Sequence, residues 1–172
     1  FRTGIKQSKN WNGNWISDSR DISIKPAAYF RKEFSKEKEI KSAYVYIAAA
    51  GLYELQLNGK RVGDHRLDPA YTRFDIRNLY VSYDVSSLIQ EKNTIGVLLG
   101  NGWYNHQSTA VWYFHEAPWR ARPKFCLDLK LEYADGTMEI VSTDKSWKTT
   151  LSPVVFNSIY TGEHYNANLE KV

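Results

Sequence analysis

The sequence predicts an all-β protein, a jelly-roll-like antiparallel β-sandwich, on three observations. Most of the chain consists of short runs rich in β-branched and aromatic residues, in which apolar and polar side chains alternate. Gly, Asn, Asp and Pro separate these runs, as is typical of tight turns. No stretch has the length and period of a long helix, so the sequence gives no helices with which to build an α/β sheet.

The clearest strands lie in the first half of the chain. Residues 43–49 are almost continuously apolar, which predicts a central strand covered on both faces. Residues 53–57 alternate between apolar and polar, which predicts one face on the core and one in water. The next pair, Asn58-Gly59, tolerates positive φ at both positions and therefore predicts a tight hairpin.

The second half of the chain continues the β pattern. A second hairpin is predicted at Asp135-Gly136, and only residues 86–91 read as helical, for one or two turns. The further strands are expected at residues 78–85, 94–99, 124–133, 137–142 and 146–150. Together these make roughly ten short strands, which favours a sandwich over smaller β folds.

The length of 172 residues, with 42% hydrophobic residues, is enough for one domain with a proper core. We expect a lead-in segment over residues 1–22 and a single sandwich domain over residues 23–172. The sequence begins with Phe1 rather than Met, so we expect a processed protein or a piece of a longer one. No apolar run approaches the ~20 residues that a membrane-spanning helix needs.

Charge and aromatic content indicate the class of ligand. The formal net charge is +4, from 23 basic and 19 acidic residues, and the basic residues are scattered rather than grouped to follow phosphates, which argues against nucleic acid. Six Trp and twelve Tyr suit wet, polar ligands such as sugars. The single cysteine, Cys126, has no partner for an intramolecular disulfide and reads as a small buried hydrophobe.

One long segment, residues 100–123, breaks the regular strand spacing and is both aromatic and polar. Loops of this length in compact domains are usually functional or disordered, and the aromatic density argues against disorder. Sugar rings stack on aromatic planes, while their hydroxyls need side-chain partners. The candidate carbohydrate-binding residues are therefore Asn101, Trp103, Tyr104, His106, Trp112 and Trp119. The alternative is that these rings pack in the core or against another domain.

The sequence predicts no catalytic residues and no metal site. An inverting glycosidase needs two carboxyl groups about 6.5–9.5 Å apart. No motif singles out such a pair among the acidic residues, which include Asp64, Asp68, Glu116 and Glu163. The four histidines lack the spacing of a helical metal site. We expect no cofactor, with calcium at Asp64 and Asp68 as an alternative.

Four segments carry a specific resemblance to a known family. They are Gly51–Asp64 followed by Leu67–Thr72; Tyr80–Val85 leading to Gly96–Tyr104; Tyr133–Gly136 with Thr143–Trp147; and Ile159–Ala167. In this order they resemble the N-terminal β-sandwich region of bacterial α-L-rhamnosidases.

The resemblance implies a jelly-roll-like module ahead of an (α/α)₆ barrel that carries the catalytic carboxylates and removes terminal rhamnose with inversion. We therefore expect a non-catalytic module that binds a rhamnose-containing glycan and partners the barrel of the same polypeptide. The alternatives are a purely structural, domain-positioning sandwich and a self-sufficient sandwich hydrolase. Localisation follows by analogy only: periplasmic or extracellular, with the cytoplasm as the alternative.

Overall fold

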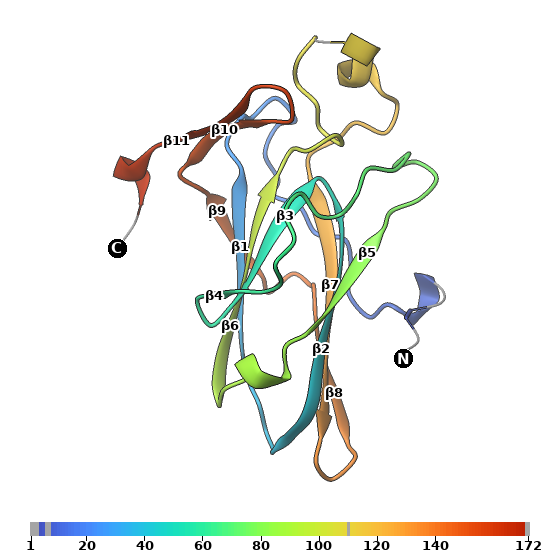
Figure 1. The fold of residues 1–172 in the computed structure, drawn as a ribbon, viewed down its shortest axis with the longest axis vertical. Helices are drawn as coiled ribbons and strands as arrows, with labels where there is room; N and C mark the ends of the chain where they lie inside the picture. The colour runs from blue at the N-terminus through green and yellow to red at the C-terminus, as the bar shows by residue number, and fades with distance from the viewer. Residues whose placement is uncertain (1–3, 6–7, 110, 171–172) are drawn as a thin grey trace.

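The computed structural model describes residues 4–5, 8–109 and 111–170, and two antiparallel sheets form its body (Figure 1). One sheet has five strands in the order β4-β3-β6-β1-β9, and the other has four in the order β5-β2-β7-β8. A separate hairpin pairs β10 with β11. The strands are β1 (Ala28–Ser35), β2 (Ile40–Ala50), β3 (Leu52–Leu57), β4 (Lys60–Arg61), β5 (Tyr80–Asp84), β6 (Lys92–Gly100), β7 (Lys124–Tyr133), β8 (Met138–Ser142), β9 (Lys148–Leu151), β10 (Val154–Ser158) and β11 (Gly162–Tyr165).

The predicted fold class is confirmed. From β1 to β9, consecutive strands lie in opposite sheets except at the β3–β4 and β7–β8 hairpins, so the chain winds around a common core. Helical structure among the described residues is confined to short 3₁₀ segments, namely η1 (Ser8–Asn10), η2 (Ser86–Leu88), η3 (Val111–Glu116) and η4 (Ala167–Leu169). The described part of the chain contains no helix long and apolar enough to span a membrane.

The core fills the space between the two sheets. Phe30 and Val97 face it from the five-stranded sheet, and Ile47 and Leu129 face it from the four-stranded sheet. The rings of Phe30 and Phe125 meet edge to face across it, with centroids 5.1 Å apart. Such alternating inward residues from both sheets are the packing expected of a β-sandwich. Next to Phe125, Cys126 is buried as predicted, and burial raises the pKa of its thiol to about 11.

Both predicted hairpins are confirmed. Asn58 and Gly59 have φ values of 55° and 75° and join β3 to β4. Gly136, with φ of 81°, closes the turn between β7 and β8. Two positive φ values in a two-residue loop match the right-handed twist of the flanking strands, which explains why the chain has Asn-Gly there.

Several elements differ from the expectation. The strands β1, β10 and β11 were not predicted, and the helical stretch expected at residues 86–91 is only the single turn of η2. The alternation of apolar and polar residues is not evident in β1, because the charged Lys32 occupies one of its core-facing positions. The side chain of Lys32 extends out of the core, and its Nζ forms a hydrogen-bonded ion pair with the carboxylate of Asp144 at 2.7 Å. Long basic side chains can bury their stem in this way while the charged end stays solvated or paired.

The lead-in segment packs along the four-stranded sheet. The carboxylate of Asp128 accepts hydrogen bonds from the backbone N–H groups of Asn12 and Gly13, at 2.9 and 2.8 Å. Ile16 then exchanges two backbone hydrogen bonds with Phe125 of β7. This segment is therefore bound to the sandwich, while the division of the chain at residue 22 stays a prediction.

Candidate functional site

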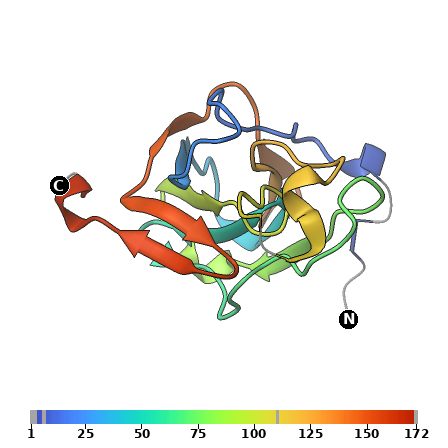
Figure 2. The same cartoon turned by 90° about the horizontal axis from the view of Figure 1, so that it is seen from above.

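The long loop 101–123 runs from β6 to β7 at one end of the sandwich. Seen from above, it lies beside the β10–β11 hairpin over that end (Figure 2). Hydrogen bonds join the two: the backbone N–H of Asn101 donates to the side-chain oxygen of Asn157 in β10 at 2.6 Å. The loop and the hairpin thus form one structural unit, although 30 residues separate them in sequence.

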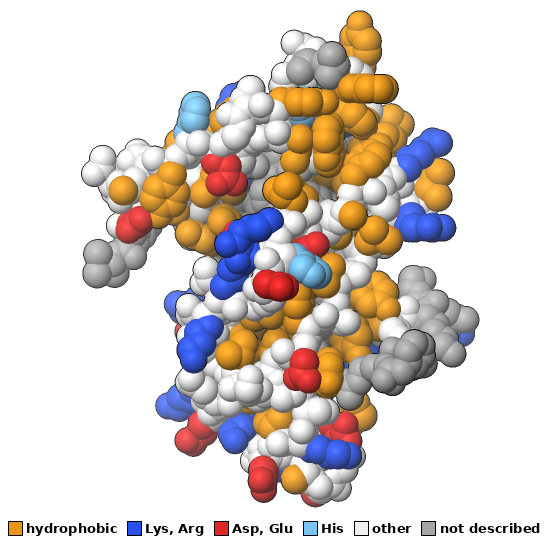
Figure 3. All heavy atoms as spheres, viewed as in Figure 1, with side chains coloured by type: hydrophobic (Ala, Val, Ile, Leu, Met, Phe, Trp, Pro, Cys, Tyr) orange, Lys and Arg blue, Asp and Glu red, His pale blue; other side chains and the backbone are white. Residues whose placement is uncertain are grey.

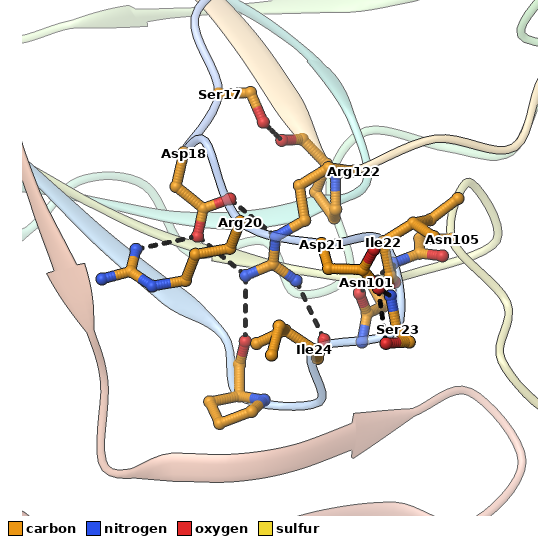
Figure 4. Close-up of polar contacts among 12 residues, drawn as sticks. Ser17, Asp18, Arg20, Asp21, Ile22, Ser23, Ile24, Asn101, Asn105 and Arg122 are labelled. Carbon is orange, nitrogen blue, oxygen red and sulfur yellow. Dashed lines mark hydrogen bonds and ion pairs between the residues drawn. The ribbon is translucent and has the colours of Figure 1, made fainter.

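Amide side chains of the loop hold the lead-in segment in place (Figure 4). The side-chain nitrogen of Asn105 donates to the backbone oxygen of Ile22 at 3.0 Å and to the side-chain oxygen of Asn101 at 3.0 Å. The amide of Gln107 donates to the backbone oxygens of Ile22 and Ile24. Because these amides satisfy backbone carbonyls of the preceding segment, Asn105 and Gln107 serve the structure of the loop itself.

A buried ion pair closes the base of the loop. Arg122 donates from Nε and one terminal nitrogen to the two carboxylate oxygens of Asp18, at 2.6 and 2.8 Å (Figure 4). Burial by itself would raise the pKa of Asp18, but the hydrogen bonds and charge of Arg122, helped by Arg20, outweigh it and hold that pKa below its ordinary value. Arg122 also donates to the backbone oxygens of Ile24 and Pro26. The pair therefore ties the lead-in segment to the end of the loop.

Two of the six predicted site residues line a polar hollow of about 190 Å³ between the loop and the β10–β11 hairpin. Asn101 and His106 contribute from the loop, and Asn157 and Ser158 contribute from β10. His106 is only 2% exposed, and its Nε2 has no hydrogen-bond partner among the described residues. Burial, together with the nearby His115 and Arg120, lowers the pKa of His106 below its ordinary value. The imidazole is therefore neutral at pH 7, and it lines the hollow with a buried nitrogen that has no partner among the described residues.

Two others, Tyr104 and Trp119, line a second hollow of about 270 Å³, to which Phe74, Asp75 and Asn78 also contribute. Tyr104 is buried, and the Nζ of Lys124 lies 5.6 Å from the centre of its ring. Trp119 is half-buried, and its indole N–H has no partner among the described residues. Asn101 therefore lines the first hollow, and Trp119 lines the second.

Trp103 and Trp112 have opposite environments. Trp103 is half-buried in an aromatic cluster, where its ring meets those of Tyr71, Phe114 and Tyr160 with centroids 5.2–5.9 Å apart. Its ring also lies 6.2 Å from that of His106, so it backs the first hollow. Trp112 is 76% exposed on the tip of the loop, where its φ is 76°. Trp112 lines neither of the two hollows.

The acidic residues considered for catalysis or calcium have other surroundings. Asp68 accepts hydrogen bonds from the hydroxyl of Tyr83 at 2.9 Å and pairs with Nδ1 of His65 at 3.1 Å. The same ring lies 3.8 Å from Asp64, so an imidazole stands between the two carboxylates. Within the described ranges, no group of three or more His, Cys, Asp or Glu side chains is arranged to hold a metal ion.

Sequence reasoning missed the residues that the hairpin brings to the first hollow. Asn157, Ser158 and Thr161 line it, as does Lys25, which lies shortly before β1. The only signal was the resemblance of residues 159–167 to a family segment, which marked this stretch without indicating that it folds against the loop.

The fold and this site define a β-sandwich module whose candidate binding groups lie on loops at one end. The chain matches the family model described as the α-L-rhamnosidase N-terminal domain over residues 38–172, and it belongs to this family. The predicted resemblance is thereby confirmed.

Relatives and solved structures agree with this assignment. An α-L-rhamnosidase of Formosa agariphila is 38% identical over 99% of this chain, which covers 20% of that protein. The structure of an α-L-rhamnosidase from "Dictyoglumus thermophilum" superimposes with a TM-score of 0.84 at 38% identity, covering 98% of this chain and 20% of that one. A Streptomyces avermitilis α-L-rhamnosidase complexed with L-rhamnose gives 0.78 at 34% identity, covering 86% and 14%. The chain thus spans about one fifth or less of the length of these relatives.

Proposed function

We propose that this domain is a non-catalytic substrate-recognition module of an α-L-rhamnosidase that removes terminal α-L-rhamnose from glycans by inversion. In this proposal an (α/α)₆ barrel of the same polypeptide supplies the catalytic acid and base, and this domain binds the rhamnose-containing glycan. The observation that carries the proposal is the hollow between the loop and the β10–β11 hairpin, which is lined mostly by polar residues and includes His106, whose buried Nε2 has no hydrogen-bond partner among the described residues.

The size and lining of the hollow suit one sugar ring. Its volume of about 190 Å³ is below that of the ~300–1,000 Å³ pockets that hold drug-sized ligands. Asn101, Ser158 and Thr161 offer amide and hydroxyl groups for sugar hydroxyls. A buried polar atom without a partner costs free energy, so a sugar that turned the His106 ring and bonded a hydroxyl to its buried Nε2 would recover that cost. The likeness to an enzyme solved with L-rhamnose supports this sugar as the first to test.

A second candidate function, domain positioning, is favoured by the apolar surface at the same end of the molecule. Hydrophobic side chains gather there, over loops 66–79 and 101–123 (Figure 3). The exposed ones include Leu67, Ile76, Trp112 and Tyr113. Contiguous exposed apolar surface of this kind usually marks an interface. In this candidate the domain holds another part of the enzyme and binds no sugar.

Calorimetric titration of the chain with L-rhamnose tests the choice. We expect saturable binding that weakens about tenfold in His106→Ala, because one hydrogen bond to a buried nitrogen is lost. Thr161→Trp should abolish binding. Thr161 is exposed and lines the hollow, so an indole ring at this position would occupy the space of the sugar. The matched control is His65→Ala, an exposed histidine that lines neither hollow.

Folding of each variant is checked by circular dichroism. Absence of L-rhamnose binding to the folded wild-type chain would reject sugar recognition and leave domain positioning as the function. Unchanged L-rhamnose affinity in folded Thr161→Trp would show that the sugar binds outside this hollow.

A further inference from the structure

A second, larger depression lies away from the loops, on the outer face of the five-stranded sheet. It has a volume of about 490 Å³ and is lined from β1, β3, β6 and β9. The strand register places Gln56, Gly96, Arg31 and Lys148 as successive partners, so they form one row across the sheet. Gly96 has no side chain, and the row is therefore open at its middle.

The fold itself gives no reason for glycine at position 96. Its φ lies outside the left-handed region, and a Cβ added there would meet nothing nearer than the Cβ of Gln56 at 3.8 Å. Glycine weakens the interior of a strand, and it often marks a place where a ligand or another backbone approaches closely. The missing side chain at Gly96 keeps the floor of the groove open.

The surface of the groove is mostly apolar, and a few polar groups of the kind that bind sugars stand along its walls. Tyr29, which is 38% exposed, and its cross-strand partner Thr150 stand one row further along. Gln56 and Thr94 add an amide and a hydroxyl. An exposed aromatic face with polar neighbours suits stacking by a pyranose ring. The volume, more than twice that of the hollow at His106, leaves room for more than one ring.

The charge of the groove is positive. Arg31 and Lys148 both line it, and no carboxylate does. Glu33, on the same strand, neutralises Arg31 through an ion pair of 2.8 Å. Lys148 has no ion pair among the described residues, and its place on the edge strand β9 leaves it exposed. Lys148 is therefore the cation of the groove that remains available to a ligand, and it lies in the same row as Gly96.

We propose that this groove binds an extended acidic oligosaccharide, with a uronate carboxylate at Lys148 and a sugar ring on Tyr29 over Gly96. The site is separate from the hollow at His106 and does not depend on it. It would allow the module to hold an acidic polysaccharide along the sheet, wherever the terminal sugar is recognised.

The test is titration of the chain with tetragalacturonate and a hyaluronan tetrasaccharide, with neutral maltotetraose and a poly-glutamate peptide as comparisons. We expect one or both acidic sugars to bind, and their affinity to fall as NaCl is raised from about 50 to about 500 mM, since salt screens exposed charges. Gly96→Leu should reduce the affinity at least about tenfold by filling the floor. Lys148→Gln should reduce it about threefold, because an exposed charge pair contributes little.

The control for Lys148→Gln is Lys92→Gln, an exposed lysine of β6 in the same sheet that does not line the groove. If Gly96→Leu does not fold, Lys148→Gln on the exposed edge strand carries the test. The proposal is overturned if neither acidic sugar binds, if maltotetraose or poly-glutamate binds as tightly, or if folded Gly96→Leu and Lys148→Gln bind like the wild type.

The two sites can be told apart. His106→Ala should leave acidic-sugar affinity unchanged, and Gly96→Leu should leave L-rhamnose affinity unchanged. Loss of both ligands in either variant would contradict the separation of the sites.

Discussion

Arg122 and Asp18 are joined by two nearly parallel hydrogen bonds of 2.6 and 2.8 Å, with the Asp18 side chain only 1% exposed. Residues 104 apart in sequence are thereby locked together at the base of the long loop. This geometry makes the loop and the lead-in segment a single rigid support for the hollow at His106.

Asp18→Asn should destabilise the domain strongly. Removing one partner of a buried ion pair leaves the other charge uncompensated, which typically costs ~3–5 kcal/mol. Urea unfolding followed by tryptophan fluorescence measures the change. Asp21→Asn is the control and should unfold near the wild-type midpoint, because Asp21 is exposed and its carboxylate accepts hydrogen bonds only from Ser23 among the described residues. A wild-type midpoint for Asp18→Asn would show that the pair does not hold the loop.

Stability should also fall as the pH drops from about 7.5 to about 5.5. Burial lowers the pKa of His106, so the unfolded chain binds a proton at a higher pH than the folded one. The stabilisation is therefore complete above the ordinary histidine pKa of 6.5 and is lost as the pH falls below it. His106→Gln removes the titrating group, and its melting temperature should change less over this range. An equal decrease in both proteins would assign the effect to other groups.

Two glycine substitutions should have opposite effects. Gly59→Ala should destabilise, because φ there is 75° although nothing lies within 4 Å of the added Cβ. Gly96→Ala should stabilise by about 0.4–1 kcal/mol, because its φ is ordinary and the space is open. Thermal unfolding of the two variants checks this directly. Destabilisation by Gly96→Ala would mean that the fold itself requires this glycine and would weaken the groove proposal.

The chain alone should not hydrolyse an aryl α-L-rhamnoside, because in the proposed function the acid and base belong to the barrel. Release of the aryl group is followed by absorbance. Activity that survives repurification and disappears when Asp68 or another internal acid is changed would overturn the non-catalytic assignment.

The fold was predictable where local pattern and burial agree. Strand β2 was visible because both its faces are covered, and the Asn58-Gly59 hairpin was visible because its turn demands positive φ. Strand β1 was missed because Lys32 occupies an inward position. The backbone oxygen of Ser142 and the carboxylate of Asp144, both more than 100 residues away, make that position tolerable by accepting hydrogen bonds from Nζ. The strands β10 and β11 were missed because they are short and show no alternation of burial: β10 is half-buried along most of its length, and β11 is exposed throughout.

The site was predictable only in part, for a similar reason. Composition singled out the loop and, within it, Asn101 and His106. It could not distinguish amides that face a ligand from amides that bind backbone, and the structure uses Asn105 and Gln107 for the lead-in segment. The contribution of Asn157 depends on tertiary contact between distant segments. Whether the six predicted residues bind sugar stays a prediction for all of them: Asn101, Trp103, Tyr104, His106, Trp112 and Trp119.

The most direct test of the account is a crystal structure of the chain soaked with L-rhamnose. We expect one sugar ring in the hollow between the loop and the β10–β11 hairpin, with a hydroxyl within hydrogen-bond distance of Nε2 of His106 and contacts to Asn101 or Ser158. A hollow that stays free of sugar at saturating L-rhamnose, or a ring bound only elsewhere, would contradict the proposed recognition site.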